Sequence, residues 1–254
     1  MSRSTFSAVA LAAVAAGFGL AAQPANAQTY VVGVENIEYL PQYTYKDGEY
    51  GGFARALLDS FAKDKGYKLE YRALPVARLF AEFVSLDLDF KYPDNAKWSA
   101  DLKSKATVVY SEPVVKYIDG VNVLPDRVGK GADSIKVLGA VRGFTPWDWL
   151  EQVKSGTVKL QENNSFTAML ETALAGRVDG AYGNVAVTAN VLESNLKQAG
   201  ALVFDPGLPH TRSHYHLSSI KHPQVIAQFN EWLKTNAASV SALKEKFQVE
   251  KGVD

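Results

Sequence analysis

Cysteine is absent from this chain of 254 residues. Its absence excludes disulfide bonds, zinc sites built on thiolates and a cysteine nucleophile. An excess of either charge is also absent, because Lys and Arg together number 27 and Asp and Glu together also number 27. No run of Lys and Arg occurs that would follow a phosphate backbone, so we expect no nucleic-acid partner.

Long apolar runs are missing except near the N-terminus. Arg3 precedes an alanine-rich apolar stretch from Ala8 to about Ala22, and the small-x-small triplet Ala25-Asn26-Ala27 follows it. A positive start, a short apolar stretch and an A-x-A-like end are typical of a secretory signal peptide, and the stretch is too short to span a membrane. We therefore expect residues 1–27 to be cleaved, leaving a mature protein that begins at Gln28 in the periplasm.

The remaining chain alternates between short β-branched runs and stretches with helical apolar spacing. The pattern predicts strands at 30–34, 67–74, 88–92, 114–124, 137–141, 158–160, 178–182 and 215–220, and helices at 53–66, 76–84, 166–174 and 184–196, with two more at the end. Such alternation predicts mostly parallel sheets covered by helices. Two series occur, one before and one after about residue 136, so we expect an α/β protein of two lobes.

Several short motifs occur in a recognisable order. They are Val31 to Tyr43, Tyr50-Gly51-Gly52-Phe53, Asp89, Tyr110-Ser111-Glu112-Pro113, Val141-Arg142-Gly143-Phe144-Thr145, and Ala175-Gly176-Arg177-Val178-Asp179-Gly180 followed by Asn184. In this order the chain resembles the bacterial periplasmic solute-binding proteins of the amino-acid type, known as family 3. The resemblance extends over the whole predicted mature chain.

The resemblance implies a periplasmic binding protein-like fold, in which two α/β lobes are joined by two hinge strands. It places lobe 1 at residues 28–116 plus 208–254 and lobe 2 at 117–207, with crossings near 117–121 and 204–209. Members of the family close on a small-molecule ligand and deliver it to the membrane subunits of an ABC transporter. We accordingly expect a monomeric binding protein without a cofactor, and not an enzyme.

Two departures from the family pattern bear on the ligand. Where members that bind α-amino acids have an Arg to hold the carboxylate, this chain has none, and Lys103 and Lys105 are the nearest cations. Lys is a weaker bidentate partner for a carboxylate than Arg. Where those members have an Asp for the ammonium group, this chain has Asn184. We therefore expect ordinary α-amino acids to bind weakly.

Candidate ligand-binding residues follow from the resemblance and from local pattern. They are Glu35, Tyr39, Tyr43, Arg78, Lys91, Tyr92, Trp98, Arg142, Thr145 and Asn184. Thr145 and Pro146 are typical of a helix start, and with Arg142 they predict a site for an anionic group of the ligand. Each candidate also has an ordinary structural interpretation, such as a helix cap for Asn184, a core position for Trp98 or a solvated charge for Arg78.

Alternative hypotheses concern metal binding, sensing and catalysis. His214 and His216 share one face of a predicted strand, but no third ligand has fixed spacing, so we expect no metal. A sensor or accessory subunit with the same fold is the main alternative. An enzyme of dehydratase or lytic type would need an acid–base pair in the cleft, such as Glu35 with Lys91.

Overall fold

The computed structural model describes residue 1 and residues 27–253, so the predicted signal peptide lies outside the described residues apart from Met1 and Ala27. The strands are β1 (Thr29–Glu35), β2 (Glu38–Tyr39), β3 (Tyr43–Lys46), β4 (Glu49–Gly51), β5 (Lys68–Leu74), β6 (Phe90–Asp94), β7 (Val109–Tyr110), β8 (Val115–Val123), β9 (Val137–Val141), β10 (Lys159–Asn163), β11 (Gly180–Asn184), β12 (Val203–Phe204) and β13 (Thr211–Ser219). The α-helices are α1 (Gly52–Lys65), α2 (Val76–Val84), α3 (Ala100–Lys103), α4 (Leu150–Lys154), α5 (Phe166–Leu174), α6 (Val185–Ser194), α7 (Pro223–Thr235) and α8 (Ala237–Phe247). Single 3-10 turns occupy Pro125–Arg127, Ala132–Ser134 and Trp147–Trp149.

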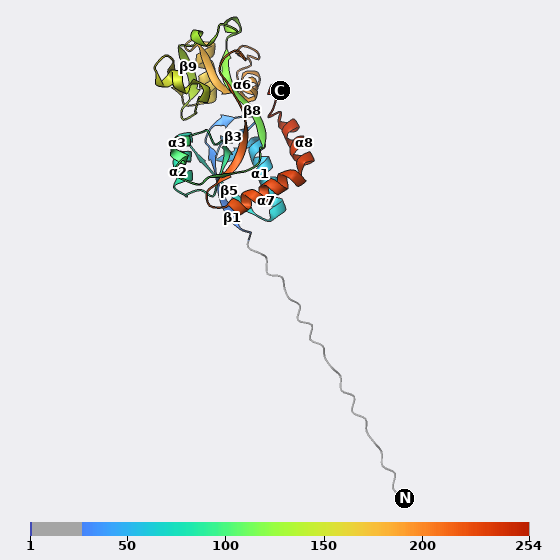
Figure 1. Cartoon of the computed structure of the whole chain (residues 1–254). Coiled ribbons are helices and arrows are strands. Elements are labelled where there is room, and N and C mark those ends of the chain that lie inside the picture. The colour runs from blue at the N-terminus through green and yellow to red at the C-terminus, as the bar shows by residue number, and fades with distance from the viewer. Residues whose placement is uncertain (2–26, 254) are drawn as a thin grey trace.

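The longer strands follow one another in the order β10-β9-β11-β8-β13-β6-β1-β5. At one end β1 pairs in parallel with β5 and β6, and at the other end β9 pairs in parallel with β10 and β11. The pairs between them, β11–β8, β8–β13 and β13–β6, are antiparallel. Two parallel α/β lobes are therefore joined through two long strands, as the sequence predicts (Figure 1).

The strands β8 and β13 cross from one lobe to the other. Residues 115–119 of β8 pair with β13, whereas residues 119–122 pair with β11 of the second lobe. The second half of β13 pairs with β6 and β7 of the first lobe. The second crossing therefore lies at Thr211–Ser219 and not at 204–209. Residues 203–204 pair with β8 as β12, and Pro206 and Pro209 lack the N–H groups that a strand ladder needs.

Amphipathic helices cover both lobes. In the first lobe, α1 buries Phe53, Leu57 and Phe61 at helical spacing, and Gly66 ends the helix with a φ of 69°. In the second lobe, α5 packs on β9, β10 and β11. Its N-terminus is capped, because the Ser165 side chain accepts a hydrogen bond from the Ala168 N–H at 3.2 Å. Local sequence signals thus set where these helices begin and end.

The structure differs from the sequence pattern in two places. After β1, where the pattern predicts no strand, β2, β3 and β4 form a small antiparallel sheet. Thr145 and Pro146, which are typical of a helix start, are followed by the 3-10 turn Trp147–Trp149, which leads into the five-residue helix α4. Pro146, which precedes the 3-10 turn, has a ψ of 77°, which is not helical. Neither the 3-10 turn nor α4 has a side-chain hydrogen bond that caps its first turn.

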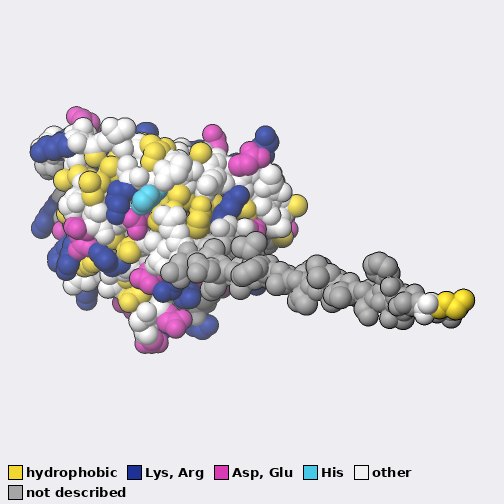
Figure 2. Space-filling view, turned by 90° about the horizontal axis from the view of Figure 1, so that it is seen from below, with side chains coloured by type: hydrophobic (Ala, Val, Ile, Leu, Met, Phe, Trp, Pro, Cys, Tyr) yellow, Lys and Arg dark blue, Asp and Glu magenta, His cyan; other side chains and the backbone are white. Residues whose placement is uncertain are grey.

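The surface shows no segregation of charge on the face seen in Figure 2. Lys and Arg side chains are interspersed there with Asp and Glu side chains and with apolar groups. Among the described residues, none of the helices combines the length and the hydropathy that a membrane span requires.

Candidate functional site

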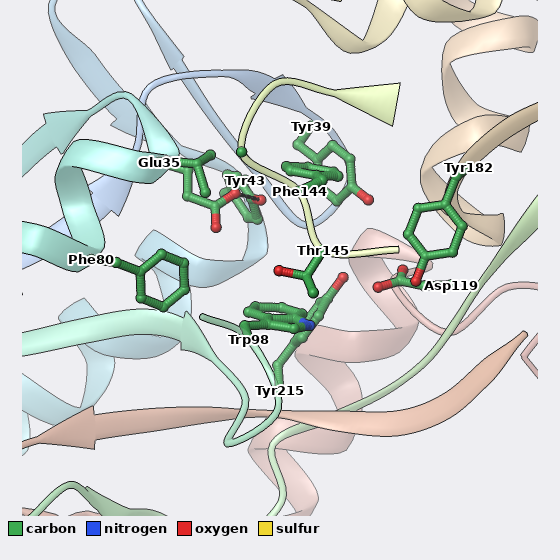
Figure 3. Close-up of a pocket in the computed structure, with 12 residues that line it drawn as sticks. Glu35, Tyr39, Tyr43, Phe80, Trp98, Asp119, Phe144, Thr145, Tyr182 and Tyr215 are labelled. Carbon is green, nitrogen blue, oxygen red and sulfur yellow. Dashed lines mark hydrogen bonds between the residues drawn. The ribbon is translucent and has the colours of Figure 1, made fainter. Parts of the chain in front are cut away.

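A pocket of about 400 Å³, partly open to solvent, lies between the two lobes (Figure 3). Its lining residues are Glu35, Tyr39, Tyr43, Val76, Phe80, Trp98, Asp119, Gly143, Phe144, Thr145, Tyr182 and Tyr215. All but Val76 and Phe80, which lie on α2, follow or lie on strands: Glu35 ends β1, Phe144 follows β9 and Tyr182 lies on β11. The carboxyl ends of parallel strands meet here, which is where open α/β sheets hold ligands.

Aromatic rings form most of the wall. The Tyr215 ring, on β13, stacks on Tyr117 of β8 with ring centroids 4.5 Å apart. Trp98 lies edge-to-face against Tyr215 at 5.7 Å. Figure 3 shows Trp98 and Tyr215 side by side below the open space, with Phe80 and Tyr182 on either side. This arrangement offers flat, polarisable surfaces to a bound molecule.

Tyr39 connects the two lobes. Its hydroxyl oxygen accepts a hydrogen bond from the backbone N–H of Asn184 at 3.1 Å. Its ring also lies edge-to-face with Phe144 at 5.6 Å and Phe166 at 4.9 Å, both in the second lobe. Gly143 comes so close to α2 that an added Cβ would lie 3.1 Å from the Cβ of Val76. The lobes are therefore in direct contact around the pocket.

Glu35 is a buried acid with partners inside the protein. The Tyr43 hydroxyl donates a hydrogen bond to it, and Lys91 Nζ lies 3.9 Å from its Oε1. Burial raises the pKa of the Glu35 carboxyl, while the Lys91 charge and the Tyr43 hydrogen bond act in the opposite direction. Lys91 itself is fully buried, donates to the Pro93 carbonyl and does not line the pocket.

Asp119 is a buried acid without such partners. It lies on β8, is 8% exposed, and its Oδ1 has no hydrogen-bond partner among the described residues. Burial raises the pKa of the Asp119 carboxyl to about 8, and the negative charges of Glu35 and Asp148 add to the rise. No positive charge opposes this shift, because none of the lining residues is Lys, Arg or His.

Half of the candidates from the sequence line the pocket. These are Glu35, Tyr39, Tyr43, Trp98 and Thr145. Asn184 and Lys91 lie directly behind the lining. Asn184 Nδ2 donates to the Tyr215 hydroxyl at 3.0 Å, while its Oδ1 caps α6 by accepting from the Val187 N–H at 3.1 Å.

The other candidates lie away from the pocket. Arg142 is 65% exposed and pairs with Glu162, with 3.6 Å between Nε and Oε2. Arg78 is 69% exposed and pairs with Glu82 at 2.6 Å. Tyr92 is buried in the core, and its hydroxyl has no hydrogen-bond partner within residues 27–253. The predicted anion site at Arg142 and Thr145 is thus not assembled, because Arg142 points to Glu162 and the segment after Thr145 is no capped helix.

The lining residues that the sequence analysis missed are Val76, Phe80, Asp119, Gly143, Phe144, Tyr182 and Tyr215. One of them had a usable signal: Asp119 is an acid in the middle of an otherwise mostly apolar strand, Val115–Val123. Such a position usually demands a partner. No cluster of three or more His, Asp or Glu side chains that could hold a metal ion occurs within residues 27–253. His216 instead lies 2.7 Å from the Ser111 carbonyl.

No family model and no curated protein sequence matches the chain. Its fold is nevertheless that of periplasmic-binding-protein-like structures. The arginine-, lysine-, histidine-binding protein ArtJ from Geobacillus stearothermophilus superposes with a TM-score of 0.70 at 20% identity, over 87% of this chain and 95% of that one. The substrate-binding protein of an amino acid ABC transporter gives 0.66 at 19% identity, over 86% and 98%. A histidine kinase sensor domain with similarity to periplasmic binding proteins gives 0.70 at 18% identity, over 87% and 96%.

Proposed function

We propose that this protein is a solute-binding protein that closes its two lobes over one small polar molecule in the pocket of Figure 3. The observation that carries the proposal is the composition of the lining. Trp98 comes from the first lobe, Phe144 and Tyr182 come from the second, and Asp119 lies on a crossing strand. A hinge motion at β8 and β13 would therefore open and close the pocket. Lobe 1 in this proposal is 28–116 with 208–254, and lobe 2 is 117–207.

The proposed role includes export to the periplasm and delivery of the ligand to an ABC permease. Its support is the likeness in fold to ArtJ and to the ABC transporter substrate-binding protein. The proposed role is binding without catalysis. Glu35 and Lys91, the pair that an acid–base enzyme would use, form a buried ion pair in which Lys91 does not reach the pocket. The histidine kinase sensor domain supports a second candidate, a sensory subunit with the same closing motion.

Ordinary α-amino acids fit this pocket poorly. No Lys, Arg or His among the lining residues is available for an α-carboxylate. Lys103, the nearest candidate cation in the sequence, is buried beside Asp94 with 3.0 Å between Nζ and Oδ1. A buried carboxylate without a partner loses on the order of 1–3 kcal/mol or more. We therefore propose that the ligand lacks a free carboxylate at this position.

Lobe closure can be measured directly because the chain has no native cysteine. Lys63→Cys on α1 and Lys154→Cys on α4 would place one dye on each lobe, at exposed positions. Native mass spectrometry of the purified protein would identify bound molecules, and energy transfer between the dyes should rise when these are added back. A control pair within lobe 2, Lys154→Cys with Lys130→Cys, should show no change.

The outcomes separate the hypotheses. A constant distance between the lobes with every bound compound would contradict a closing receptor. Chemical conversion of the compound would indicate an enzyme instead. Co-purification with a histidine kinase in place of a permease would favour the sensory role.

A further inference from the structure

Asp119 lies where three strands meet. It pairs with Thr211 of β13 on one side and with Asn184 of β11 on the other, so it marks the junction of both crossing strands with lobe 2. Its side chain lines the pocket and is shown beside Tyr182 in Figure 3. An acid at this point is held by backbone pairing on both flanks. Its position is therefore fixed, and its carboxyl group is one of the groups that line the pocket.

The carboxylate of Asp119 lacks compensation inside the protein. Its Oδ1 has no hydrogen-bond partner in the part of the chain that the structure describes. The buried lysines nearby are engaged elsewhere: Lys91 lies beside Glu35 and Asp94, and Lys103 pairs with Asp94. An unpaired buried charge is costly unless a partner arrives from outside. A positive charge on a bound ligand would supply the missing partner.

The surroundings favour an organic cation over a metal ion. Among the described residues no group of three His, Asp or Glu is placed to hold a metal. Around Asp119 lie instead the rings of Tyr39, Tyr182, Tyr215 and Trp98. Aromatic faces attract ammonium and guanidinium groups and cover their alkyl parts. A metal ion would find one carboxylate and no second strong ligand at this point.

We infer that the pocket binds an organic cation without a free carboxylate, an ammonium or guanidinium compound whose charge lies against Asp119 between these aromatic rings. The inference rests on the proposed binding function and specifies its ligand. Glu35 is already partly compensated by Lys91 and by the Tyr43 hydroxyl, so Asp119, whose Oδ1 has no partner among the described residues, is the better counter-ion for a cation. The two acids of the pocket therefore have different roles.

Pairs of charged and neutral compounds of the same shape test whether binding depends on the charge of the ligand. Choline and butylammonium are cations of suitable size. Dimethylbutanol, which is choline with carbon in place of nitrogen, and butanol are their neutral counterparts, and butyrate is an anion. Calorimetry should show binding of at least one of the cations, while the neutral counterparts bind at least about thirtyfold more weakly because they form no ion pair with the Asp119 carboxylate. Equal binding of a neutral counterpart, or failure of both cations, overturns the inference.

Two variants locate the charge that is responsible. Asp119→Asn keeps the size of the side chain and should weaken cation binding at least about thirtyfold. Asp148→Asn removes a neighbouring charge that does not line the pocket and that Thr211 already hydrogen-bonds, so it should change the affinity by a few-fold at most. Equal losses in the two variants would show a general effect of negative charge and overturn the assignment to Asp119.

Proton release gives a second readout that does not depend on affinity. The titratable groups facing Asp119 are Glu35 of β1, Tyr39 of the small sheet, Tyr117 of β8, Asp148 of the 3-10 turn, Tyr182 of β11 and Tyr215 of β13. Because the pKa of Asp119 is raised to about 8, the empty pocket holds its proton at neutral pH and a bound cation expels it. Binding enthalpies measured in two buffers of different ionisation enthalpy give the number of protons released. This number should be close to one for the native protein and zero for Asp119→Asn.

The failure of this inference is distinguishable from failure of the proposed function. Binding of butyrate or of a neutral compound with lobe closure would leave the binding function intact and overturn only the charge of the ligand. A cation that binds without proton release, or with equal release in Asp119→Asn, would overturn the role of Asp119. Absence of closure with every compound would contradict the proposed function itself.

Discussion

The two acids that line the pocket, Glu35 in lobe 1 and Asp119 at the junction with lobe 2, carry the same charge in opposite surroundings. Glu35 accepts from the Tyr43 hydroxyl and lies 3.9 Å from Lys91 Nζ. Among the described residues, Asp119 Oδ1 has no hydrogen-bond partner, and no positive charge opposes the rise of the Asp119 pKa. Both lose hydration on burial, but only for Glu35 does the protein offset the loss. A satisfied buried charge is part of the structure, whereas an unsatisfied one in a pocket indicates a ligand.

Glu35 belongs to a cluster of buried charges in lobe 1 that also includes Lys91, Asp94 and Lys103. Asp94 accepts from Lys103 at 3.0 Å, from the Ser218 hydroxyl at 2.7 Å and from the Asn95 N–H at 2.8 Å. The cluster ties β6 to β13, so its charges hold the first lobe to one crossing strand. Substitutions in the cluster should therefore lower the stability of the folded protein. Removal of the Asp119 charge should instead raise the stability of the empty protein and weaken the binding of a ligand.

The largest expected effect comes from Asp119→Asn in the empty protein. The folded-state pKa of about 8 lies above the ordinary value of 3.8, so the folded protein binds the Asp119 proton more tightly than the unfolded chain. The free energy of unfolding therefore falls as pH rises from about 4 to about 8. Asp119→Asn lacks this proton and should be equal in stability to the native protein near pH 4, and more stable by about 6 kcal/mol above pH 8.

Denaturant unfolding across that pH range measures the effect. Glu35 also has a raised pKa, but it is present in both proteins and largely cancels in the difference. Asp126→Asn, an exposed acid of the same lobe, serves as the control and should show no pH-dependent difference. If the difference in free energy of unfolding between the native protein and Asp119→Asn does not change with pH, the Asp119 charge is compensated in the folded protein.

The next effect has the opposite sign and belongs to lobe 1. Asp94→Asn should destabilise the protein by about 3 kcal/mol, because Lys103 and Lys91 would be left buried with less negative charge beside them. Asp101→Asn on α3, which changes an exposed acid, should stay within about 0.5 kcal/mol. Chemical denaturation at neutral pH compares the two. A loss as small as that of Asp101→Asn would show that the cluster contributes nothing measurable to folding.

Most of the fold was predictable because its signals are local. Apolar spacing indicated α1 and α5, Ser165 marked a helix start and Gly66 a helix end. The sheet β2–β4 was not predictable, since strands of two to four residues are too short to show a period. The candidate site was predictable only in part, and for a related reason. Asp119 acquires its role from Asn184 and Thr211, which are remote in sequence.

The same reasoning explains the position of Arg142, which does not line the pocket. It follows β9 where ligand contacts are expected, but the parallel pairing of β9 with β10 brings Glu162 alongside, 3.6 Å from Arg142 Nε. Strand pairing between residues twenty positions apart is set by tertiary packing, which short motifs do not encode. The partners of the charged residues could therefore be identified only from the structure. The aromatic lining residues Tyr39 and Tyr43 could be named from the sequence.

The smallest expected effect tests the contact between the lobes. Tyr39→Phe keeps the ring packing on Phe144 and Phe166 but removes the acceptor for the Asn184 N–H, which would be left buried and unpaired. The cost should be about 1 kcal/mol, which corresponds to roughly a fivefold shift from closed to open lobes. Tyr50→Phe is the matched control, because the Tyr50 hydroxyl is buried without a hydrogen-bond partner among the described residues and its loss breaks no bond. Energy transfer between dyes at Lys63→Cys and Lys154→Cys should fall for the empty Tyr39→Phe protein and stay unchanged for Tyr50→Phe. Because the hydrogen bond joins the lobes and not the parts of one lobe, unfolding of each lobe should be little affected. Equal energy transfer in the two variants would show that ring packing alone holds the lobes together.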